Sequence, residues 1–287
     1  MPEHYQNNSF LITGASGQLA KEFQRQLAGQ GAAFNAPLED QFDISKEKMI
    51  NQTLDNFQPS VVINCAAYND VEKAETDPKV FLVNTKAVEY LGKACRERNI
   101  TLVHFSSDYV FDGNKNSAYL EKDLQNPLNK YGDSKYRAEK YLQEYCKNYL
   151  ILRLSWMFGD GKSNFLYKLN SWLKGQSNLK IAADEFSCPT YTEDVVKITL
   201  MGIQKQLRGL FHLTNSGCCS RYAWAQYYLK QTKPKVVLRQ ASMSDFPSRV
   251  KRPRRSCLSN QKLSEALKIN IPTWQDAVDR FVARKYF

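Results

Sequence analysis

The sequence is poor in the residues from which metal centres and disulfide frameworks are built. It has only 3 histidines, and none of its 7 cysteines forms a Cys-x-x-Cys pair. Transition-metal sites need such ligands in clusters, so we expect no His/Cys metal site. The number of cysteines is odd, and Cys218 and Cys219 are adjacent, which suits no ordinary disulfide. We therefore expect free thiols and a reducing compartment, the cytoplasm.

Long apolar runs and low-complexity segments are also missing. No uninterrupted apolar stretch approaches the roughly 20 residues that a membrane-spanning helix needs. Residues 1–9 are polar and lack the core of a signal peptide. We therefore expect no membrane partner. With 287 residues and 43% hydrophobic content, the chain is long enough to bury a large core, as one domain or as one domain with an appendage.

Acidic residues are fewer than basic ones, 29 against 40, which gives a formal net charge of +11. This balance favours anionic partners: nucleic acid, acidic membranes or phosphorylated small molecules. Most of the surplus is dispersed along the chain. Residues 251–255, Lys-Arg-Pro-Arg-Arg, form the one dense basic run, which fits either a solvated loop or an anion site.

Short apolar runs alternate with segments of helical periodicity in the first half of the chain. Runs typical of buried strands lie at residues 10–13, 32–35, 61–64, 101–105 and 149–154. The segments between them carry apolar residues every three or four positions, which predicts helices. Strands that alternate with helices in this way predict an α/β fold with a doubly wound parallel sheet.

Two further expectations concern local structure. Asp43-Ile44-Ser45 is predicted to cap a helix that begins just after it. Beyond Trp156 the alternation loosens, with helices expected over residues 165–174 and 192–204 and a strand at 210–213. This second half is predicted to be a smaller region that faces the substrate.

A glycine-rich turn, Gly14-x-x-Gly17-x-x-Ala20, connects the first predicted strand to the first predicted helix. A dinucleotide's pyrophosphate must approach backbone N–H groups at a helix N-terminus, and glycine leaves room for that approach. The turn therefore predicts a dinucleotide site. Glu39 and Asp40 lie near the distance at which an acidic residue would bind the ribose of NAD, but they follow the end of the predicted strand by several residues. The choice between NADH and NADPH stays open.

A hydroxyl, a phenol and an amine follow the strand predicted at residues 101–105. Ser107 ends this apolar run, and Tyr131 and Lys135 lie four positions apart, so they share one face of a helix. A free tyrosine has a pKa of about 10, and a nearby ammonium stabilises the phenolate and lowers that pKa. The phenol can then give a proton to a carbonyl oxygen while hydride arrives at the carbon. With the glycine-rich turn, this set predicts a reductase.

These residues belong to a longer series of motifs. The chain resembles an extended short-chain dehydrogenase/reductase and, more narrowly, is similar to the dTDP-4-dehydrorhamnose reductase family. The motifs that carry the resemblance run in order over nearly the whole chain: Gly14-Ala-Ser-Gly-Gln-Leu, Asp43-Ile-Ser, Asn64-Cys-Ala-Ala-Tyr68, Val71-Glu-Lys-Ala-Glu75, Ser106-Ser-Asp-Tyr-Val-Phe-Asp-Gly113, Pro127-Leu-Asn-Lys-Tyr-Gly-Asp-Ser-Lys135, Arg153-Leu-Ser-Trp156, Asn164-Phe165, Asp184-Glu-Phe-Ser-Cys-Pro-Thr190, Gly209-Leu-Phe-His212, Arg252-Pro253 with Ser256 and Leu258, and Pro272-Thr-Trp-Gln275.

The resemblance implies an NADP(H)-binding Rossmann domain at residues 8–155. It also implies a smaller C-terminal domain at residues 156–287, mainly for a sugar nucleotide, interleaved with Rossmann elements around residues 192–213. The implied reaction is reduction of the C4 keto group of a dTDP-6-deoxy-4-keto-hexose to dTDP-L-rhamnose, with NADPH, or alternatively NADH. Some members of the family form homodimers, and a homodimer is an open option for this chain.

The resemblance also implies roles for individual residues. Tyr131 would be the acid, Lys135 would lower its pKa and hold the nicotinamide ribose, and Ser107 would bind the keto oxygen. The residues expected to bind the cofactor are Gly14, Ser16, Gly17, Gln18, Leu19, Asp43, Ile44, Ala66, Ala67, Tyr68, Tyr131 and Lys135. The residues expected to bind the substrate are Ser107, Asp108, Tyr109, Trp156 and Arg252. Because an arginine clamps a diphosphate well, the basic run then becomes a phosphate site and not a nucleic-acid site.

The chain departs from the family pattern at a few positions. Ala20 stands where glycine is frequent, and Ser187 replaces a usual glycine. Arg255 stands where many members have asparagine, and the pair Cys218-Cys219 is unusual. Since Arg255 and the cysteine pair lie in the substrate half, they leave the identity of the sugar nucleotide open.

Two alternatives remain at this point. The same fold and similar motifs occur in the regulatory β subunit of methionine adenosyltransferase, which would make the chain a non-catalytic NADP-binding protein. A reductase that acts on a different nucleotide 4-keto sugar is the other alternative. The segment from Arg153 to Trp156 and the pair Asn164-Phe165 favour a reductase.

Overall fold

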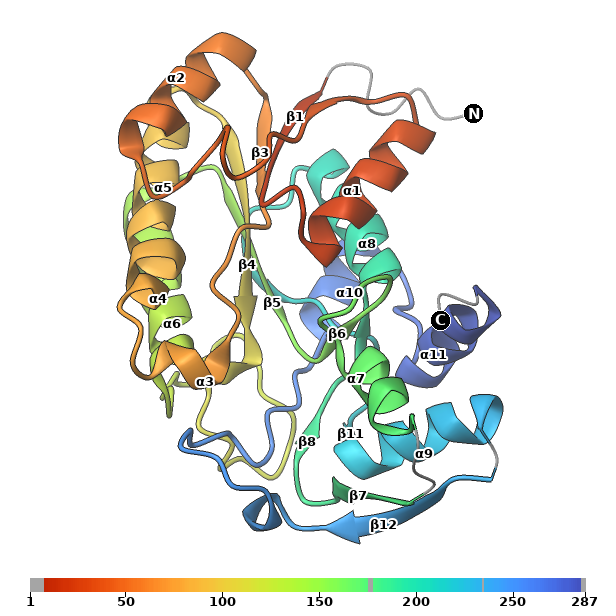
Figure 1. Ribbon diagram of the computed structural model, residues 1–287. Helices are drawn as coiled ribbons and strands as arrows, with labels where there is room; N and C mark the ends of the chain where they lie inside the picture. The colour runs from red at the N-terminus through yellow and green to blue at the C-terminus, as the bar shows by residue number, and fades with distance from the viewer. Residues whose placement is uncertain (1–7, 175–177, 234, 285–287) are drawn as a thin grey trace.

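The computed structural model describes residues 8–174, 178–233 and 235–284, so most of the polar N-terminal stretch assessed above lies outside the described residues. At the centre is a six-stranded, all-parallel sheet in the order β10-β5-β4-β3-β1-β2 (Figure 1). Its strands are β1 (Ser9–Thr13), β2 (Ala33–Asn35), β3 (Val61–Asn64), β4 (Thr101–Ser107), β5 (Tyr149–Leu154) and β10 (Gly209–His212). The predicted doubly wound parallel sheet is confirmed.

Helices cover both faces of this sheet (Figure 1). On one face lie α2 (Glu47–Phe57), the continuous run of α4 (Lys79–Phe81), the π-helical η1 (Leu82–Lys86) and α5 (Ala87–Glu97), and then α6 (Lys130–Tyr145). On the other face lie α1 (Gln18–Gly29), α8 (Thr192–Gln204) and α10 (Gln261–Leu267). Among the described helices, none is long and apolar enough to cross a membrane.

The apolar character of the strands follows from this double cover. In β1, Phe10 and Ile12 belong to the core on the α1 side, whereas Leu11 belongs to the core on the α2 side. β3 alternates in the same way, with Ile63 facing α1 and Val62 facing α2. Because successive side chains of a strand point to opposite faces and both faces are buried, the strands read as unbroken apolar runs.

The rest of the chain packs beside one end of the sheet around a third apolar core. Trp224 and Phe281 are fully buried in that core. The elements of this part of the chain are β6 (Met157–Phe158), α7 (Phe165–Trp172), β7 (Asn178–Ala182), β8 (Phe186–Ser187), β9 (Thr190–Tyr191), β11 (Cys219–Ser220), α9 (Arg221–Thr232), β12 (Val237–Ala241) and α11 (Trp274–Ala283). Three short turns complete the fold: α3 (Val71–Ala74) and the 3₁₀ turns η2 (Asp108–Val110) and η3 (Met243–Asp245).

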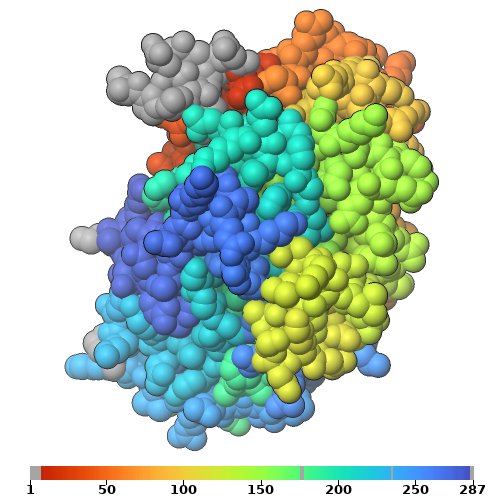
Figure 2. Space-filling model, turned by 180° about the vertical axis from the view of Figure 1, so that it is seen from behind, coloured from red at the N-terminus to blue at the C-terminus, as the bar shows by residue number. Residues whose placement is uncertain are grey.

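The segment that follows β12 returns to the central sheet on the back of the molecule. Figure 2 shows the yellow loop after β4 beside the blue C-terminal segment. There the backbone N–H of Tyr119 donates to the carbonyl of Cys257 at 2.8 Å, and the N–H of Ser259 donates to the carbonyl of Tyr119 at 2.9 Å. This short parallel bridge places Ser256 and its neighbours at the end of β4.

Two local expectations are wrong. Asp43 does not cap a helix, because α2 begins at Glu47 after Lys46 and the Asp43 carboxylate instead accepts from the backbone N–H and hydroxyl of Ser45, at 2.9 and 2.7 Å. An Asx turn of this kind competes with a helix cap for the same carboxylate. The helix expected over residues 165–174 also ends earlier, at Trp172.

The expectation of free thiols throughout is also wrong. Cys218 and Cys257 form a disulfide with their Cα atoms 5.7 Å apart, whereas Cys65, Cys95, Cys146, Cys188 and Cys219 are free. The two bonded residues are 39 positions apart in sequence. The adjacency of Cys218 and Cys219 therefore says nothing about pairing, since the partner arrives through the tertiary fold.

Gly132 offers a test of how closely α6 docks on the chain after β4. A Cβ at Gly132 would lie 2.2 Å from the carbonyl oxygen of Tyr109, whereas a Cβ at Gly29, at the end of α1, would meet nothing within 4 Å. We expect Gly132→Ala to lower the free energy of unfolding in urea by about 1–3 kcal/mol, because α6 must shift. The control, Gly29→Ala, should raise it by about 0.5–1 kcal/mol. Equal stability of the two variants would contradict the close docking.

Candidate active site

The carboxyl ends of the central strands open into a cleft. A cavity of about 680 Å³ lies there, between the sheet and the C-terminal region. Of the residues predicted to bind cofactor or substrate, it is lined by Gly17, Gln18, Leu19, Ala66, Ala67, Ser107, Asp108, Tyr131, Lys135, Trp156 and Arg252. The edge where strands of a doubly wound sheet end is the usual place for a ligand.

The other predicted residues lie around this cavity and do not line it. Asp43 and Ile44 lie in the turn before α2, where Ile44 is part of the core. The backbone N–H of Tyr68 donates to the side-chain amide of Asn84, and the backbone carbonyl of Tyr68 accepts from the same amide. The phenol of Tyr68 donates to Asp77 at 3.0 Å. Gly14 and Ser16 form the turn behind Gly17, and Tyr109 packs its ring edge-on against Tyr131 with centroids 5.8 Å apart.

The glycine-rich turn has the backbone geometry that a nucleotide site needs. Gly14 has φ +65°, and a Cβ there would lie 2.8 Å from the backbone of Ala66. Gly17 is the N-cap of α1 and offers no side chain to the first N–H groups of the helix. These groups and the positive end of the helix dipole are therefore free for an anion.

Two buried polar atoms near this turn have no hydrogen-bond partner within the described part of the chain. They are the amide nitrogen of Gln18, at the start of α1, and the hydroxyl of Ser106, at the end of β4. Buried polar groups are rarely left unpaired, so each points to a polar ligand. The cradle of glycines and these two atoms fit a dinucleotide. Among the described residues, no group of three or more His, Cys, Asp or Glu could hold a metal ion.

Helix α6 brings Tyr131 and Lys135 to Ser107. The Asn129 side chain caps α6 by accepting from the N–H of Gly132 at 2.8 Å. Lys135 is 3% exposed, and its ammonium donates to the carbonyl of Phe105 at 3.1 Å. Ser107, which is also buried, ends β4 beside Tyr131.

The charge states differ from the expectation for an isolated Tyr–Lys pair. Burial raises the pKa of Tyr131 above its ordinary value, and a hydrogen bond with Ser107 acts in the opposite direction. Burial also lowers the pKa of Lys135 to about 8. The ammonium binds a backbone carbonyl and is itself desolvated, so in this state burial outweighs the expected lowering of the Tyr131 pKa. Tyr131 is therefore a protonated phenol near neutral pH.

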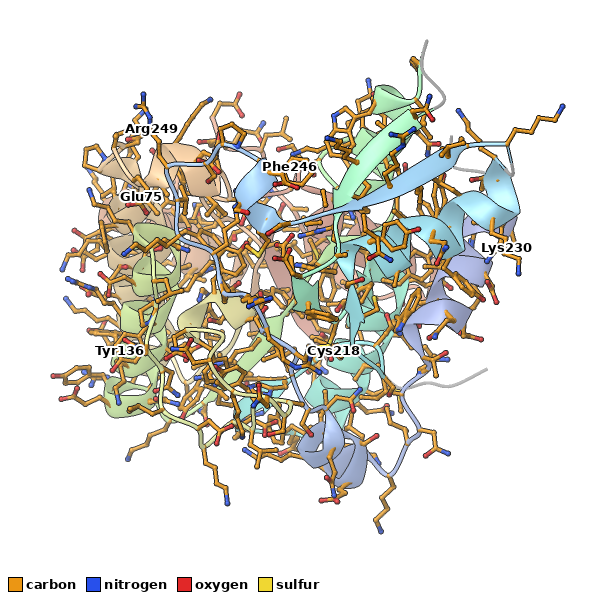
Figure 3. All side chains as sticks on the ribbon, turned by 90° about the horizontal axis from the view of Figure 1, so that it is seen from below. Glu75, Tyr136, Cys218, Lys230, Phe246 and Arg249 are labelled. Carbon is orange, nitrogen blue, oxygen red and sulfur yellow. A yellow bond between two sulfur atoms is a disulfide. The ribbon has the colours of Figure 1, made fainter. Side chains whose placement is uncertain are left out.

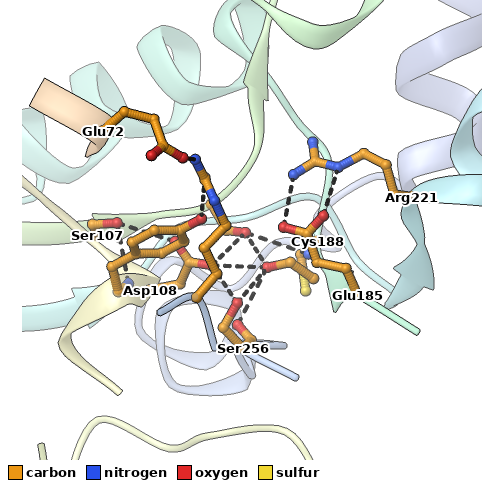
Figure 4. Close-up of polar contacts among 11 residues, drawn as sticks. Glu72, Ser107, Asp108, Glu185, Cys188, Arg221 and Ser256 are labelled. Carbon is orange, nitrogen blue, oxygen red and sulfur yellow. Dashed lines mark hydrogen bonds and ion pairs between the residues drawn. The ribbon is translucent and has the colours of Figure 1, made fainter. Parts of the chain in front are cut away.

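Trp156 is held in a strained conformation at the wall of the cavity. Its φ is +37°, in the left-handed region that bulky residues rarely occupy. Its ring stacks on Trp224, with centroids 5.7 Å apart, and the guanidinium of Arg221 lies 3.6 Å from its centroid. Arg221 in turn donates to Glu185 at 3.1 and 3.3 Å (Figure 4). The indole is thus fixed as a rigid wall.

The basic run is neither a continuous patch nor a plain solvated loop. Arg252 turns into the cleft, where it donates to the Tyr109 phenol at 3.1 Å and to the Glu72 carboxylate at 2.7 Å. Arg255 instead packs over the ring of Phe186, 5.0 Å from its centroid. Only Arg252 of these arginines lines the cleft.

A second cavity, of about 740 Å³, adjoins the first, and Ser163, Lys168 and Arg252 line both. Figure 3 shows Phe246 and Arg249 on the connection that runs from β12 toward the side where Glu75 lies. Besides the shared residues, the wall includes Phe165, Trp172, Lys180, Glu185, Arg221 and Phe246. The sequence analysis assigned no site role to these residues, because they are scattered over α7, β7, α9 and the loops between elements.

Asn84 is a second residue that the sequence analysis missed. It lies in the π-helical turn η1 and is 1% exposed. Its amide accepts from the N–H of Tyr68 at 2.8 Å and donates to the carbonyl of Tyr68 and to the hydroxyl of Ser134. It therefore ties the loop at the cofactor cradle to α6, consistent with the frequent occurrence of π-turns at functional sites.

Comparison with known proteins decides the family. Residues 8–287 match the family model of the RmlD substrate binding domain. The chain belongs to this family. A dTDP-4-dehydrorhamnose reductase from Aggregatibacter actinomycetemcomitans is 33% identical over 282 residues, which is 93% of this chain and 96% of the relative.

Solved structures agree. A dTDP-4-dehydrorhamnose reductase from Clostridium acetobutylicum has a TM-score of 0.93 at 31% identity and covers 97% of this chain and 100% of that chain. The reductase from Bacillus anthracis, solved in complex with NADP, has a TM-score of 0.93 at 28% identity and covers 96% and 99%. The predicted membership of the dTDP-4-dehydrorhamnose reductase family of oxidoreductases, and the predicted Rossmann-like fold, are confirmed.

The burial of Lys135 has a consequence for stability. Lowering its pKa from 10.5 to about 8 costs the folded state about 3 kcal/mol near neutral pH. We expect Lys135→Met to raise the free energy of unfolding in urea by about 1–2 kcal/mol at pH 7, since loss of the bond to Phe105 offsets part of the gain.

The pH dependence checks the cause. Below pH 8 the folded and unfolded chains both carry the charge, so the penalty is complete. Between about 8 and 10.5 the unfolded wild type binds a proton that the folded form lacks. Wild-type stability therefore rises with pH and approaches that of the variant. The exposed Lys140, replaced by Met, should change stability by less than about 0.5 kcal/mol. A gap that does not narrow with pH would show that desolvation is not its source.

Proposed function

We propose that the chain reduces the C4 keto group of a dTDP-6-deoxy-4-keto-hexose to give dTDP-L-rhamnose. The observation that carries the proposal is the convergence of Ser107, Tyr131 and Lys135 in one cleft beside a dinucleotide cradle. The names of the relatives and the NADP complex of the Bacillus anthracis structure support it. NADPH is the proposed cofactor, with NADH as the alternative.

The residues of the cradle would hold the cofactor. The free N–H groups after Gly17 and the amide of Gln18 would bind the pyrophosphate, and Ala66 and Ala67 would pass along the dinucleotide. Lys135 would hold the nicotinamide ribose. When bound, the reduced nicotinamide supplies hydride to the substrate carbon.

Tyr131 supplies the proton. Because burial raises its pKa, the phenol is protonated at neutral pH and can donate to the keto oxygen as negative charge develops there. The pKa of Lys135, about 8, leaves its amine mostly charged at pH 7, and this charge stabilises the phenolate left behind. Ser107 lines the same cleft, where its hydroxyl would bind the keto oxygen, and its effect on Tyr131 is to lower the pKa of the phenol.

The second cavity suits the nucleotide end of the substrate. Arg252, Lys168 and Lys180 bring positive charge to the junction and to the wall of the cavity, where a diphosphate would lie. Phe165, exposed Trp172 and Phe246 offer apolar surface for a base. Residues 8–155 then act mainly on the cofactor, and residues 156–287 mainly on the sugar nucleotide. The cytoplasmic location and the homodimer stay predictions.

Replacement of the phenol tests the proposed proton donor. We expect Tyr131→Phe to lower kcat with NADPH and the 4-keto sugar nucleotide by about 10²–10⁴-fold, followed as loss of nicotinamide absorbance. Tyr136→Phe is the matched control on the same helix, because Tyr136 does not line the cavity. Unchanged activity of Tyr131→Phe would refute its role. Absence of turnover by the wild type, together with co-purification of a methionine adenosyltransferase, would favour the regulatory alternative.

Arg252 and Arg254 form a matched pair for the diphosphate site. Arg252 lines the cleft, whereas Arg254 is exposed outside it. We expect Arg252→Met to raise KM for the sugar nucleotide about 10–100-fold with kcat changed only a few-fold, since a charged hydrogen bond to phosphate is lost. Arg254→Met should leave KM unchanged. A panel of dTDP-, UDP-, GDP- and CDP-linked 4-keto sugars, run with both variants, identifies the nucleotide.

A further inference from the structure

Trp156 has a backbone conformation that its place in the fold does not explain. The described ranges contain five non-glycine residues with positive φ, and four of them lie at or just after the end of a helix: Gln58, Asn99, Gln206 and Lys268. The left-handed conformation is common there. Trp156 instead lies between β5 and β6, with φ +37°. Such strain in a bulky residue persists only where the surroundings hold it, and it is frequent at functional sites.

The backbone on either side of Trp156 is fixed. The carbonyl of Trp156 accepts from the N–H of Thr190 at 3.2 Å, where β6 pairs with β9. On the other side, the hydroxyl of Ser155 donates to the buried Asp108 carboxyl at 3.2 Å. This carboxyl also accepts from three further serine hydroxyls, those of Ser107, Ser187 and Ser256. These bonds hold the main chain, but they do not reach the indole.

The indole is held by its contact with Arg221. The guanidinium carbon of Arg221 lies 3.6 Å from the centroid of the Trp156 ring, which is close enough for a cation–π interaction in van der Waals contact. The ring of Trp224 lies nearly parallel to the indole, with centroids 5.7 Å apart and 12° between the planes. Since Trp224 is a core residue, Arg221 is the contact that can be removed with the smaller effect on the core.

Arg221 is itself held in place by Glu185 (Figure 4). Its Nε and one Nη donate to the Glu185 carboxylate at 3.3 and 3.1 Å, and its backbone N–H donates to the carbonyl of Glu185 at 3.0 Å. A planar guanidinium that makes two bonds to one carboxylate has a fixed orientation. Arg221 is also the first residue of α9, so both its backbone and the end of its side chain are anchored.

The pair of Trp156 and Arg221 separates the two cavities. Trp156 lines the first cavity and not the second, whereas Arg221 lines the second and not the first. Three residues line both cavities and mark the opening between them: Ser163, Lys168 and Arg252. A substrate with its sugar in the first cavity and its nucleotide in the second would pass through this opening. The indole would then face the sugar, with the guanidinium behind it.

We propose that Arg221 is a positioning residue for the keto reduction. It holds the Trp156 indole in its strained place, so that the sugar binds against a fixed wall with the keto oxygen within reach of Tyr131. Arg221 acts through the indole and needs no contact with the substrate. The inference rests on the proposed function, from which it takes the proton donor and the sugar site in the first cavity.

Direct binding of a phosphate is the other role open to an arginine in the second cavity. The ion pair of Arg221 with Glu185 is shielded, with 18% and 12% of the two side chains exposed. The ion pair of Arg252 with Glu72 is more open, at 29% and 46%. A phosphate would therefore exchange more readily with Glu72 than with Glu185. This difference leaves Arg252 to the diphosphate and Arg221 to the indole.

A double-mutant cycle with Trp156 tests the proposal. Arg221→Met keeps the length of the side chain and removes the cation and the bonds to Glu185. With NADPH and the 4-keto sugar nucleotide, we expect it to lower kcat by about 10–100-fold, because a misplaced substrate reacts slowly. In the Trp156→Ala background the same substitution should lower kcat less than about threefold, since no indole is left to position. The Kd of dTDP, which has no sugar beyond its nucleoside, should change less than about threefold in every variant.

Two further variants complete the experiment. Arg221→Lys keeps a cation near the indole but lacks the planar fork, so its kcat should lie between those of the wild type and Arg221→Met. Arg239→Met is the control, because Arg239 is exposed on β12 and lines neither cavity; its kcat should equal that of the wild type. If Arg221→Met does not fold, the cycle is run with Arg221→Lys, whose smaller loss should likewise vanish in the Trp156→Ala background.

The outcomes separate this inference from the proposed function. If the wild type turns over the keto sugar and the change at Arg221 lowers kcat equally in both backgrounds, Arg221 does not act through Trp156, and the inference is wrong. It is also wrong if kcat is unchanged and the Kd of dTDP rises instead, because Arg221 then binds the nucleotide. If the wild type turns over no keto sugar, the proposed function fails, and this inference fails with it.

Discussion

Desolvation of ionisable groups at the carboxyl edge of the sheet is the constraint on which the site depends. Tyr131, Lys135 and Asp108 lie where water has little access, and burial disfavours the charged form of each. A phenol kept neutral can donate a proton. An amine with a lowered pKa can change its protonation when the charge of a neighbouring group changes. The backbone carbonyl of Phe105 and the serine hydroxyls around Asp108 replace part of the lost water. The packing of α6 against η2 through Gly132 holds this edge together.

Much of the fold could be predicted from the sequence, because its signals are local. Apolar strands buried on both faces read as continuous runs, and the helices between them carry an apolar stripe. The glycine-rich turn, with Gly14 at positive φ, is recognisable because only glycine tolerates the close approach to Ala66. Ser107, Tyr131 and Lys135 could be placed in one site for a similar reason, since a strand end and one helix face determine where they point.

What could not be predicted depends on contacts between distant segments. The serines around Asp108 come from four places in the chain, and no spacing links Ser187 to Ser256. The same holds for the disulfide of Cys218 with Cys257, whose two segments are brought together by β8, which pairs with β11 and bridges to Arg255. The spacing of Tyr131 and Lys135 in the sequence also does not show how deeply the pair is buried. Burial raises the pKa of Tyr131, whereas Lys135 alone would be expected to lower it.

The ion pair between Arg252 and Glu72 affects the free energy that an anion would gain by binding in this cleft. The guanidinium does not wait as an uncompensated positive charge, because a carboxylate already lies 2.7 Å away. An anion that bound Arg252 would have to exchange with Glu72, and its gain in free energy would be the difference between the two ion pairs. A small monovalent anion gains little from such an exchange. A ligand with several negative oxygens and further contacts would gain more, so the Arg252–Glu72 pair would favour ligands of higher negative charge.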